Sequence, residues 1–478
     1  MSGRPISSLL LTSFAILIGC GREDVTLELS MSDVVPTVAN VMWDTRYNAV
    51  DAVWLEYGLT EDLTMRRTLP GSGAKVPLLG LKAGHAYWAR VVVEVGGKTS
   101  ASETVSFETG NPPPDFPEVD VEVFDVDRAH TGFLVTTLFV SPTAPVILDS
   151  DGDYVWWYVP DNAYDINYSR AAISADAGVV WAWTLNVQGS SGGDDDSCGS
   201  KVDDEFTLGV FVGPCGDGQP HLALNGDQAL LKIPWDGGDV ESYQVPDGHH
   251  DMVALPSGSI AYLKYDRRIL DGDKYEGDRI IERAWDGGTS EMWSVWDDFT
   301  PTDLPEVPGM TWSHANALDY VSDQGAYYLS AFGMGALLKI DREGGFVDWV
   351  LGGADSDFTE STDLEYAPAV RGHQFDVFDD RVLLFENGES ERMFSQVLEF
   401  QLDEASGKAD VVWSYRPEPD IYSFSLGDVQ RLESGNTLVT FSNQGLIEEV
   451  SPEGEVLWRL SMSVGGALGY LTHLDTLP

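Results

Sequence analysis

The chain has 478 residues, of which 78 are Asp or Glu and 28 are Lys or Arg, so its formal net charge is −50. This charge repels nucleic-acid phosphates and offers them no basic surface, which excludes DNA and RNA as partners. A content of 43% hydrophobic and 11% aromatic residues is typical of a globular body, and the length predicts two domains.

The first twenty residues are typical of an export signal. Arg4 gives a basic start, and the apolar run 9–18 is too short to span a bilayer comfortably. The run ends in Leu-Ile-Gly-Cys20, which resembles the bacterial lipobox, in which the cysteine is diacylated and becomes the mature N-terminus. We expect a signal peptide over residues 1–20, a membrane anchor through lipid at Cys20, and a location in the bacterial cell envelope, either periplasmic or at the outer membrane or cell surface. The alternative is an ordinary secretory signal with a chance cysteine.

Short alternating strands dominate residues 25–110 and predict a small β-sandwich. The phrase Leu-Lys-Ala-Gly-His-Ala-Tyr at 81–87 resembles the tyrosine corner of fibronectin type III modules and of purple-phosphatase-like N-terminal modules. His85 lies inside this corner and is interpreted as a structural or surface residue. The proline-rich stretch 111–117 predicts an extended spacer and marks the domain boundary.

Residues 118–478 contain one strand-turn-strand phrase six times. Each copy runs from an apolar strand through Asp, Gly or Glu turn residues into a strand that carries Trp or Tyr, which predicts a hairpin. The six copies occupy residues 147–159, 230–245, 280–295, 337–353, 397–415 and 446–460. Units repeated at 40 to 60 residues bury their apolar faces against their neighbours, so the sequence predicts an all-β fold, a six-bladed β-propeller after the small sandwich.

One interval of this repeat is longer than the others and holds Cys198 and Cys215 in a Gly/Asp-rich stretch. We interpret it as an insertion within one blade. In an exported protein an even pair of cysteines is most simply a disulfide that closes the loop. A thiol nucleophile is the alternative, but the neighbouring aspartates would raise the thiol pKa.

Three histidines recur at the blade interval. His250, His314 and His373 are 64 and 59 residues apart, in matching register near the predicted inner strands. Equivalent positions of successive blades face the same end of the central axis, so we expect the three imidazoles to meet at one mouth. Asp428 lies at a similar position in the next blade and is a further candidate for this funnel.

The phrases around these residues resemble the bacterial arylsulfotransferases, PAPS-independent aryl-sulfate enzymes built as six-bladed propellers with a small N-terminal β domain. The resemblance rests on the phrases His-His-Asp at 249–251, His-Ala-Asn at 314–316, Leu-Leu-Lys-Ile-Asp at 337–341 with Leu-Gly-Gly at 351–353, Gly-His at 372–373 before VLLFENG, and RLESGNTLV at 431–439. It implies transfer of a sulfuryl group from a phenolic sulfate donor to a phenol acceptor through a covalent sulfohistidine, without a cofactor.

The same resemblance implies roles for individual residues. His373 falls on the position of the nucleophile. His250, or its neighbour His249, and His314 would protonate the departing phenolate and accept the proton of the incoming phenol. Asn316 would donate a hydrogen bond to a sulfonate oxygen.

One position departs from the family pattern. Phe332 stands where the family has an arginine, and sulfuryl transfer needs positive charge near the non-bridging oxygens. Arg371, two residues before His373, would substitute if its side chain turned inward. Any anionic substrate of so acidic a chain must find a local positive pocket.

Two other functions remain open at the level of sequence. The three histidines, completed by Asp251 or Asp428, could bind a transition metal. Alternatively, the propeller of a non-catalytic surface lipoprotein binds a ligand or partner, which the missing arginine favours. The acidic turns 149–153 and 271–278 resemble calcium loops but do not complete the twelve-residue EF-hand pattern, so we interpret them as hairpin turns.

Overall fold

A computed structural model gives the fold of the chain. It describes residues 24–130, 132–139, 142–160, 167–174, 178–185, 228–270, 273–300, 312–361, 372–388, 392–463 and 468–478. The chain divides into two compact units. Unit 1 comprises the described residues up to Ser30 with Asn40–Val76 and Ala86–Glu108, and unit 2 comprises Met31–Ala39, Pro77–His85 and Thr109–Pro478.

Two sheets carry most of unit 1. The first has the order β1-β2-β5, with β1 at Val25–Met31, β2 at Ala39–Thr45 and β5 at Val76–Leu78. The second has the order β4-β3-β6-β7, and β8 also pairs with β6. Its strands are β3 (Ala52–Gly58), β4 (Met65–Thr68), β6 (Ala86–Val95), β7 (Lys98–Ala101) and β8 (Val105–Glu108). In the phrase at 81–87, Tyr87 is buried and stacks on Phe107, whereas the exposed His85 contacts the carbonyl of Ala83, which agrees with a structural role for this histidine.

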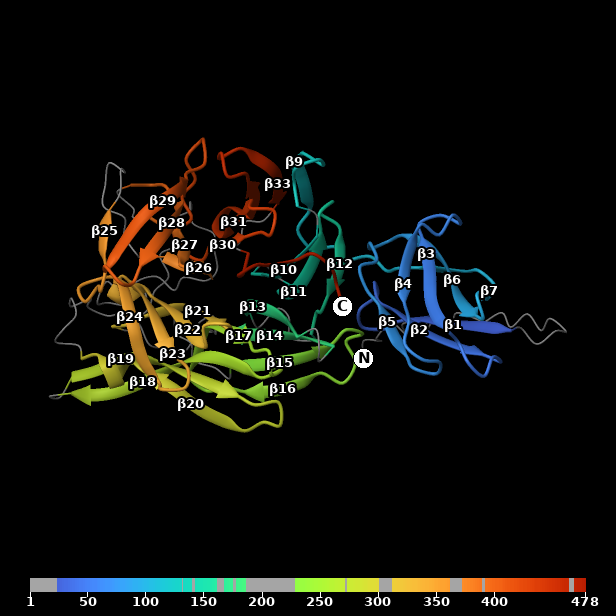
Figure 1. Ribbon diagram of the computed structural model, residues 1–478, viewed down its shortest axis with the longest axis horizontal. Coiled ribbons are helices and arrows are strands. Elements are labelled where there is room, and N and C mark those ends of the chain that lie inside the picture. Colours follow the sequence, from blue (N-terminus) through green and yellow to red (C-terminus); the bar gives the residue numbers. More distant parts are fainter. Residues whose placement is uncertain are drawn as a thin grey trace, which may run out of the picture. The chain divides into compact units, whose positions relative to one another are not determined.

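The described residues of unit 2 form six sheets, antiparallel apart from one added strand, that follow one another in chain order around a common centre (Figure 1). The first four sheets have four strands each. They are β34-β10-β11-β12, β13-β14-β15-β16, β17-β18-β19-β20 and β21-β22-β23-β24. Their bounds are β10 Phe133–Leu138, β11 Ala144–Asp149, β12 Tyr154–Trp157, β13 Asn167–Ser174, β14 Val179–Leu185, β15 Ala229–Pro234, β16 Glu241–Gln244, β17 Gly248–Ala254, β18 Ile260–Leu270, β19 Asp273–Arg283, β20 Thr289–Ser294, β21 Ala315–Val321, β22 Ala326–Ala331, β23 Ala336–Asp341, β24 Phe346–Gly352 and β34 Thr472–Leu474.

The last two sheets have five strands each. They are β26-β27-β28-β29 with β25 added in parallel beside β29, and β30-β31-β32-β33 with β9 added beside β33. Their bounds are β9 Val119–Phe124, β25 Thr359–Ser361, β26 Gly372–Phe378, β27 Arg381–Glu386, β28 Gln396–Asp403, β29 Lys408–Tyr415, β30 Asp428–Arg431, β31 Thr437–Phe441, β32 Leu446–Val450 and β33 Val456–Met462. The helices among the described residues are short: α1 at Val295–Asp298, and 3-10 turns at Phe332–Met334 and Ser442–Gln444.

The six predicted hairpins are confirmed, because each is formed by two antiparallel neighbours at the outer side of one sheet. These pairs are β11–β12, β15–β16, β19–β20, β23–β24, β28–β29 and β32–β33. The strands β14 and β15 are neighbours in one sheet, so the long interval is an insertion within a sheet, as predicted. Cys198 and Cys215 lie in this insertion and are outside the described residues. Cys20, near the N-terminus, is also outside the described residues.

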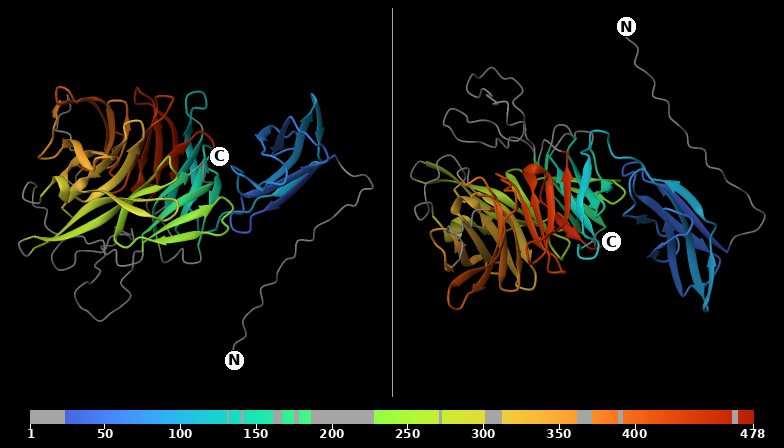
Figure 2. Two further views of the ribbon diagram at one scale, coloured as in Figure 1. Left: turned by 60° about the horizontal axis from the view of Figure 1, so that its bottom comes forward. Right: turned by 90° about the horizontal axis from the view of Figure 1, so that it is seen from above.

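The two ends of unit 2 enter each other's sheets. The early strand β9 extends the sheet formed by the last strands, and the C-terminal strand β34 pairs with β10 in the first sheet. Figure 2 shows the C-terminus beside these opening strands. This exchange makes the propeller-like arrangement continuous from the last sheet to the first.

Apolar side chains join each sheet to the next. Because successive side chains of a strand point to opposite faces, Tyr327 packs toward the third sheet and Tyr328 toward the fifth. Six separate clusters of buried residues each join two consecutive sheets, including the last and the first, where Trp458 packs in one cluster with Trp157. A sheet that is covered on both faces explains why the strands have runs of buried residues, such as Ala326–Ala331.

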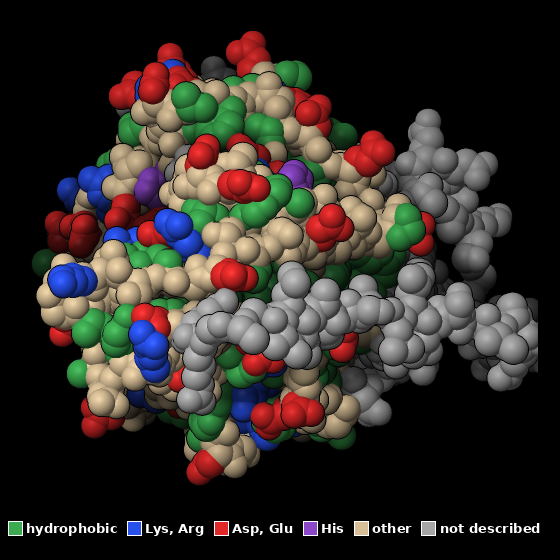
Figure 3. Space-filling view, turned by 90° about the vertical axis from the view of Figure 1, so that its right-hand side faces the viewer, with side chains coloured by type: hydrophobic (Ala, Val, Ile, Leu, Met, Phe, Trp, Pro, Cys, Tyr) green, Lys and Arg blue, Asp and Glu red, His purple; other side chains and the backbone are tan. Residues whose placement is uncertain are grey.

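On the face shown in Figure 3, carboxylates outnumber basic groups and are scattered rather than gathered in one patch. Among the described residues, no helix has the length and apolar character needed to cross a bilayer.

Candidate functional site

His250, His314 and His373 lie at the start of three consecutive sheets. His250 is in β17, His314 directly precedes β21, and His373 is in β26. Each of these strands is the first of its sheet, near the common centre, and β17 contacts β21, which contacts β26 (Figure 1). The three imidazoles thus occupy equivalent positions in three neighbouring sheets.

The backbone has the same irregularity at all three places. The pairing with the next strand shifts between Gly248 and Met252, between Ala315 and Ala317, and between Gly372 and Phe375. Such bulges redirect side chains at the edge of a sheet. His250 and His314 also have positive φ angles of 49° and 42°, a region that non-glycine residues adopt only when the surroundings enforce it.

The rings lie close together. The centroids of His250 and His314 are 5.2 Å apart, with the ring planes at 67°. Phe332 lies between the other two histidines, 5.6 Å from the ring of His314 and 6.2 Å from that of His373. His314 and His373 each act electrostatically on His250 and lower its pKa. We call His250, His314 and His373 the imidazole group.

Burial keeps the imidazole group uncharged. It lowers the pKa of His314 and of His373 to about 4, and it lowers the pKa of His250 well below its usual value, with further lowering by the neighbouring histidines. Asp278 opposes this effect at His314, and a hydrogen bond to Asn387 opposes it at His373. At neutral pH the three rings are therefore neutral.

His249 lies behind His250 and is fully buried. Its ring stacks on Tyr265 at 4.0 Å, its Nδ1 is 3.0 Å from Nδ1 of His250, and its Nε2 is 3.0 Å from Oδ1 of Asp278. The other oxygen of Asp278 accepts hydrogen bonds from Ser313 Oγ and the backbone N–H of Ala315, both at 2.7 Å. Burial by itself would raise the pKa of Asp278, but these contacts lower it overall. These close contacts form a path from a carboxylate through His249 to His250, in which Nε2 of His249 and Oδ1 of Asp278 lie near each other without the geometry of a hydrogen bond.

Asn387 fixes the tautomer of His373. The Nδ2 group of Asn387 donates to the carbonyls of Ser423 and Leu426, both at 2.8 Å, so its Oδ1 is the atom that contacts Nδ1 of His373 at 2.7 Å. An amide oxygen only accepts, so Nδ1 carries the hydrogen. The lone pair of His373 is therefore on Nε2.

Asn316 is buried close to this group. Its Nδ2 is 3.5 Å from the carbonyl of Gly372, and its Oδ1 has no hydrogen-bond partner within the described part of the chain. The amide therefore keeps capacity for a further hydrogen bond. Arg371, the predicted substitute cation, lies outside the described residues. Among the described residues, no lysine or arginine influences the pKa values of the three histidines.

Asp428 belongs to a different cluster. With Arg170, Asp251 and Tyr470 it forms a group of mutually interacting charged and polar side chains, in which Nε of Arg170 is 3.5 Å from Asp251. Asp251 accepts a hydrogen bond from Gln374 at 2.7 Å, so this group adjoins the imidazole group through the residue after His373. Burial raises the pKa of Asp428 to about 7, against the opposing effect of Arg170.

Groups of ligand atoms close enough for a metal occur elsewhere. Among the described residues, three ligand atoms within 4.8 Å of one another are found in His130, His473 and Asp475, and in Asp149, Asp151 and Asp153. The imidazole group forms no such set, which does not favour the metal alternative at His250, His314 and His373. The acidic turn at 149–153 surrounds the ammonium of Lys82, with distances of 2.5 to 3.1 Å, so a cation of the protein already lies there.

Two important residues were not identified from the sequence. Asp278 lies in the stretch 271–278 that we interpreted as a turn, but it is in β19 and buried against His249. Asn387 follows β27 inside the VLLFENG phrase. For Asn387, the apolar strand followed by a polar Glu-Asn pair was a signal in the sequence. Nothing in the local sequence indicated a role for Asp278.

Comparisons with known proteins give one informative result. The family model described as Arylsulfotransferase (ASST) matches residues 123–461, and no curated protein matches the chain. Among solved structures, a protein of unknown function from Bacteroides caccae has 11% identity and a TM-score of 0.42, over 72% of this chain and 99% of its own. A virginiamycin B lyase from Staphylococcus aureus has 13% identity and a TM-score of 0.36, over 71% and 88%.

A chain of a nidogen/laminin complex has 11% identity and a TM-score of 0.42, over 72% of this chain and 99% of its own. At such low TM-scores these structural similarities support no conclusion about this chain. The family model covers well over half of the chain and includes His250, His314 and His373. The chain therefore belongs to the arylsulfotransferase family.

Proposed function

We propose that this chain transfers a sulfuryl group from a phenolic sulfate ester to a phenol, with His373 as the covalent carrier. The observation that carries the proposal is the contact between Asn387 and His373. It leaves Nε2 with its lone pair, and burial keeps the ring neutral by lowering its pKa to about 4. A neutral, oriented imidazole is a nucleophile at neutral pH.

The first half of the reaction forms a nitrogen–sulfur bond. Nε2 of His373 attacks the sulfur of the aryl sulfate, the bond from sulfur to the phenolic oxygen breaks, and the electron pair of that bond leaves with the phenolate. The hydrogen on Nδ1 stays in place against Asn387, whose carbonyl oxygen stabilises the positive charge that develops on the ring.

The second half reverses these changes on a new phenol. The phenol oxygen attacks the sulfur, the nitrogen–sulfur bond breaks, and Nε2 regains its lone pair. The phenolic proton moves to a neutral imidazole of His250 or His314, both within the same group. The path from Asp278 through His249 supports the positive charge on His250 at this step.

The departing phenolate of the first half needs a proton. An aryl sulfate carries a negative charge, and a nearby negative charge raises the pKa of an imidazole. Binding of the donor therefore draws a proton onto His250 or His314, which are neutral before binding. The imidazolium protonates the phenolate and is then neutral, ready to accept the proton of the second phenol.

The same imidazolium compensates in part for the arginine that is missing at Phe332. Positive charge next to the sulfonate is required in the transition state, and the Phe332 ring supplies none. Nδ2 of Asn316, which contacts the carbonyl of Gly372 at 3.5 Å and carries a second hydrogen, is the candidate donor to a sulfonate oxygen. Arg371 remains a second candidate for the positive charge.

The test is detection of the intermediate. The protein is incubated with a chromogenic aryl sulfate without acceptor, and peptide mass spectrometry is used to look for a sulfo group on the peptide that contains His373. We expect one equivalent of phenol released and one sulfo adduct at His373, which is removed when a phenol is added. Absence of both phenol release and adduct would exclude the enzyme and favour the second candidate, a non-catalytic ligand-binding propeller, which the Phe332 substitution supports.

The proposal includes a setting for this chemistry. We infer a closed six-bladed propeller, supported by the six sheets and the clusters between them, and a β-sandwich related to fibronectin type III modules in unit 1. We also propose that the chain is exported, anchored through lipid on Cys20 in the bacterial cell envelope, and cross-linked between Cys198 and Cys215.

A further inference from the structure

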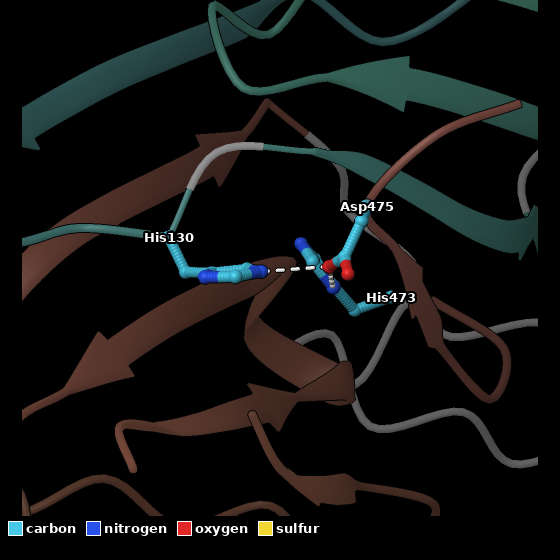
Figure 4. A group of neighbouring side chains, drawn as sticks. All are labelled: His130, His473 and Asp475. Atoms are coloured by element: carbon cyan, nitrogen blue, oxygen red, sulfur yellow. Dashed lines mark hydrogen bonds and ion pairs between the residues drawn. The ribbon is translucent and has the colours of Figure 1, made fainter. Parts of the chain in front are cut away.

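A second group of histidines lies where the two ends of unit 2 meet. His130 comes shortly before β10, His473 lies in the C-terminal strand β34, and Asp475 follows that strand. The side chains of His130, His473 and Asp475 point toward one another (Figure 4). We call these three residues the terminal cluster.

The ligand atoms of the terminal cluster are spaced for one ion. Nε2 of His130 is 2.7 Å from Oδ1 of Asp475, Nδ1 of His473 is 3.7 Å from the same oxygen, and the two rings are 5.1 Å apart. A tetrahedral zinc ion with bonds of about 2.0 Å separates its ligand atoms by roughly 3.3 Å, midway between the two distances. Small side-chain movements are enough to place all three atoms around an ion.

Hydrogen bonding alone accounts for only part of this arrangement. The contact between His130 and Asp475 is an ordinary hydrogen bond, but the 3.7 Å from His473 to Asp475 is too long for one. Nε2 of His473 is buried and has no hydrogen-bond partner within the described part of the chain. The buried ring therefore has no good hydrogen bond at either nitrogen, and an ion bound at Nδ1, the atom nearer Asp475, would supply one of the two missing partners.

The backbone is built around this ring. A Cβ atom on Gly132 would lie 2.5 Å from Nε2 of His473, so only glycine leaves room for the imidazole there. His130 is held from behind, because its backbone N–H contacts both carboxylate oxygens of the buried Glu449 at 2.8 and 3.0 Å. His130, Gly132, Glu449 and His473 also line a small cavity of about 10 Å³, about the size of one water-sized group.

The charges of the cluster suit a divalent ion. His130 and His473 offer imidazole nitrogens, and Asp475 offers a carboxylate oxygen. Two imidazoles and one carboxylate are ligands that zinc and related transition metals accept, and an exposed Asp475 leaves a position for water.

We propose that His130, His473 and Asp475 bind a divalent transition-metal ion, for which zinc is the probe. The ion fastens the C-terminal strand to the segment that leads into β10, across most of the length of unit 2. The strand β34 is short, and its pairing with β10 involves Thr472, His473 and Leu474. Because the three ligands converge only in the folded chain, the ion stabilises the closed arrangement.

The test is zinc binding by the whole protein, purified without a histidine tag and treated with chelator. Titration calorimetry is carried out with excess magnesium, which occupies weak carboxylate sites on so acidic a surface but competes poorly for imidazole. We expect one zinc ion per chain and a rise in the melting temperature with zinc. Asp475→Asn and His130→Gln should each weaken the zinc affinity at least tenfold and remove most of that rise.

The matched control is Asp420→Asn, which removes an exposed carboxylate paired with Arg416 and should leave zinc binding unchanged. Melting of each metal-free variant reports whether it folds. Absence of zinc binding by the unaltered protein would overturn the proposal. It is equally overturned if zinc binds to Asp475→Asn as to the unaltered chain, since the ion then lies elsewhere, for example at the imidazole group. Neither outcome affects the sulfo adduct expected at His373.

Discussion

The imidazole group and the terminal cluster both contain histidines of unit 2, but the neighbours of these histidines differ. In the imidazole group, Nδ1 of His373 is occupied by a neutral amide and His250 is contacted by another histidine, and the carboxylate of Asp278 contacts His249 behind them. In the terminal cluster, a carboxylate is within 2.7 to 3.7 Å of both rings. The group that contacts the imidazole nitrogens therefore distinguishes the two sites: an amide at His373, the proposed nucleophile, and a carboxylate at His130 and His473, the proposed metal ligands.

The largest expected effect comes from removing the nucleophile. His373→Asn should reduce aryl-sulfate turnover by a factor on the order of 10⁴ or more, because the covalent route is lost. The measurement is phenol release with a chromogenic donor. The control is His85→Gln, an exposed histidine outside the site, which should keep full activity. Turnover of His373→Asn at the normal rate would place the carrier on another residue.

The sequence located the imidazole group because its members repeat with the sheets. His250, His314 and His373 fall at one place in three consecutive units, so their convergence followed from the repeat. Asp278 reaches His249 from β19, two strands away from β17 in the same sheet, and no regular interval relates the two. The terminal cluster was not predicted either, because its residues lie near the two ends of unit 2 and no regular interval relates them.

The expectation for Asp428 illustrates another limit. Its place in the repeat resembles that of the histidines, but its oxygens accept hydrogen bonds from the backbone of Val429 and Leu471 and it interacts with Arg170. The C-terminal segment that carries Leu471 enters the first sheet, which a local repeat does not predict. The hairpins, in contrast, depend only on neighbouring residues, and all six were found.

Restoring the missing positive charge should increase activity. Phe332→Arg places a guanidinium between His314 and His373, where loss of such a donor typically costs about 10²–10³ in rate. We expect kcat/KM for aryl sulfates to rise at least tenfold, measured by phenol release. Phe332→Gln, a neutral polar control, should show no such gain. A loss of activity in both variants would mean that the site depends on the aromatic ring itself.

Changing the partner of His373 should move the pH profile. In Asn387→Asp the carboxylate stabilises the imidazolium, so the pKa of His373 rises from about 4 and the ring is protonated over a wider acidic range. Because the protonated ring is not a nucleophile, the acidic limb of kcat should shift to higher pH, with activity at pH 5 reduced about tenfold relative to pH 8.

The control for this change is Asn387→Ala, which loses orientation without adding charge. It should lower kcat at every pH and leave the position of the acidic limb in place. Identical profiles for Asn387→Asp and the unaltered protein would show that His373 is not the titrating group of the reaction.

The path behind His250 should have a smaller effect. Asp278→Asn removes the negative charge that stabilises a positively charged His250, so the second half of the reaction should slow by about 10- to 100-fold, because Asp278 acts through another residue. Single-turnover kinetics separate the halves: formation of the sulfo adduct should change less than its transfer to phenol. Equal slowing of both halves would point to a general loss of structure, which a lower melting temperature would reveal.

The smallest effect distinguishes the imidazole group from the adjoining group around Asp428. Burial raises the pKa of Asp428 to about 7 from 3.8, so its contribution to stability is present in full below pH 4 and is lost as the pH rises through 7. Asp428→Asn resembles the protonated acid but loses one of two backbone hydrogen bonds at every pH. The informative quantity is therefore how the difference in melting temperature between Asp428→Asn and the unaltered protein changes with pH. The melting temperature of Asp428→Asn, relative to the unaltered protein, should improve by a few degrees between pH 5 and pH 8. A difference that stays constant over this range would mean that Arg170 keeps Asp428 ionised throughout.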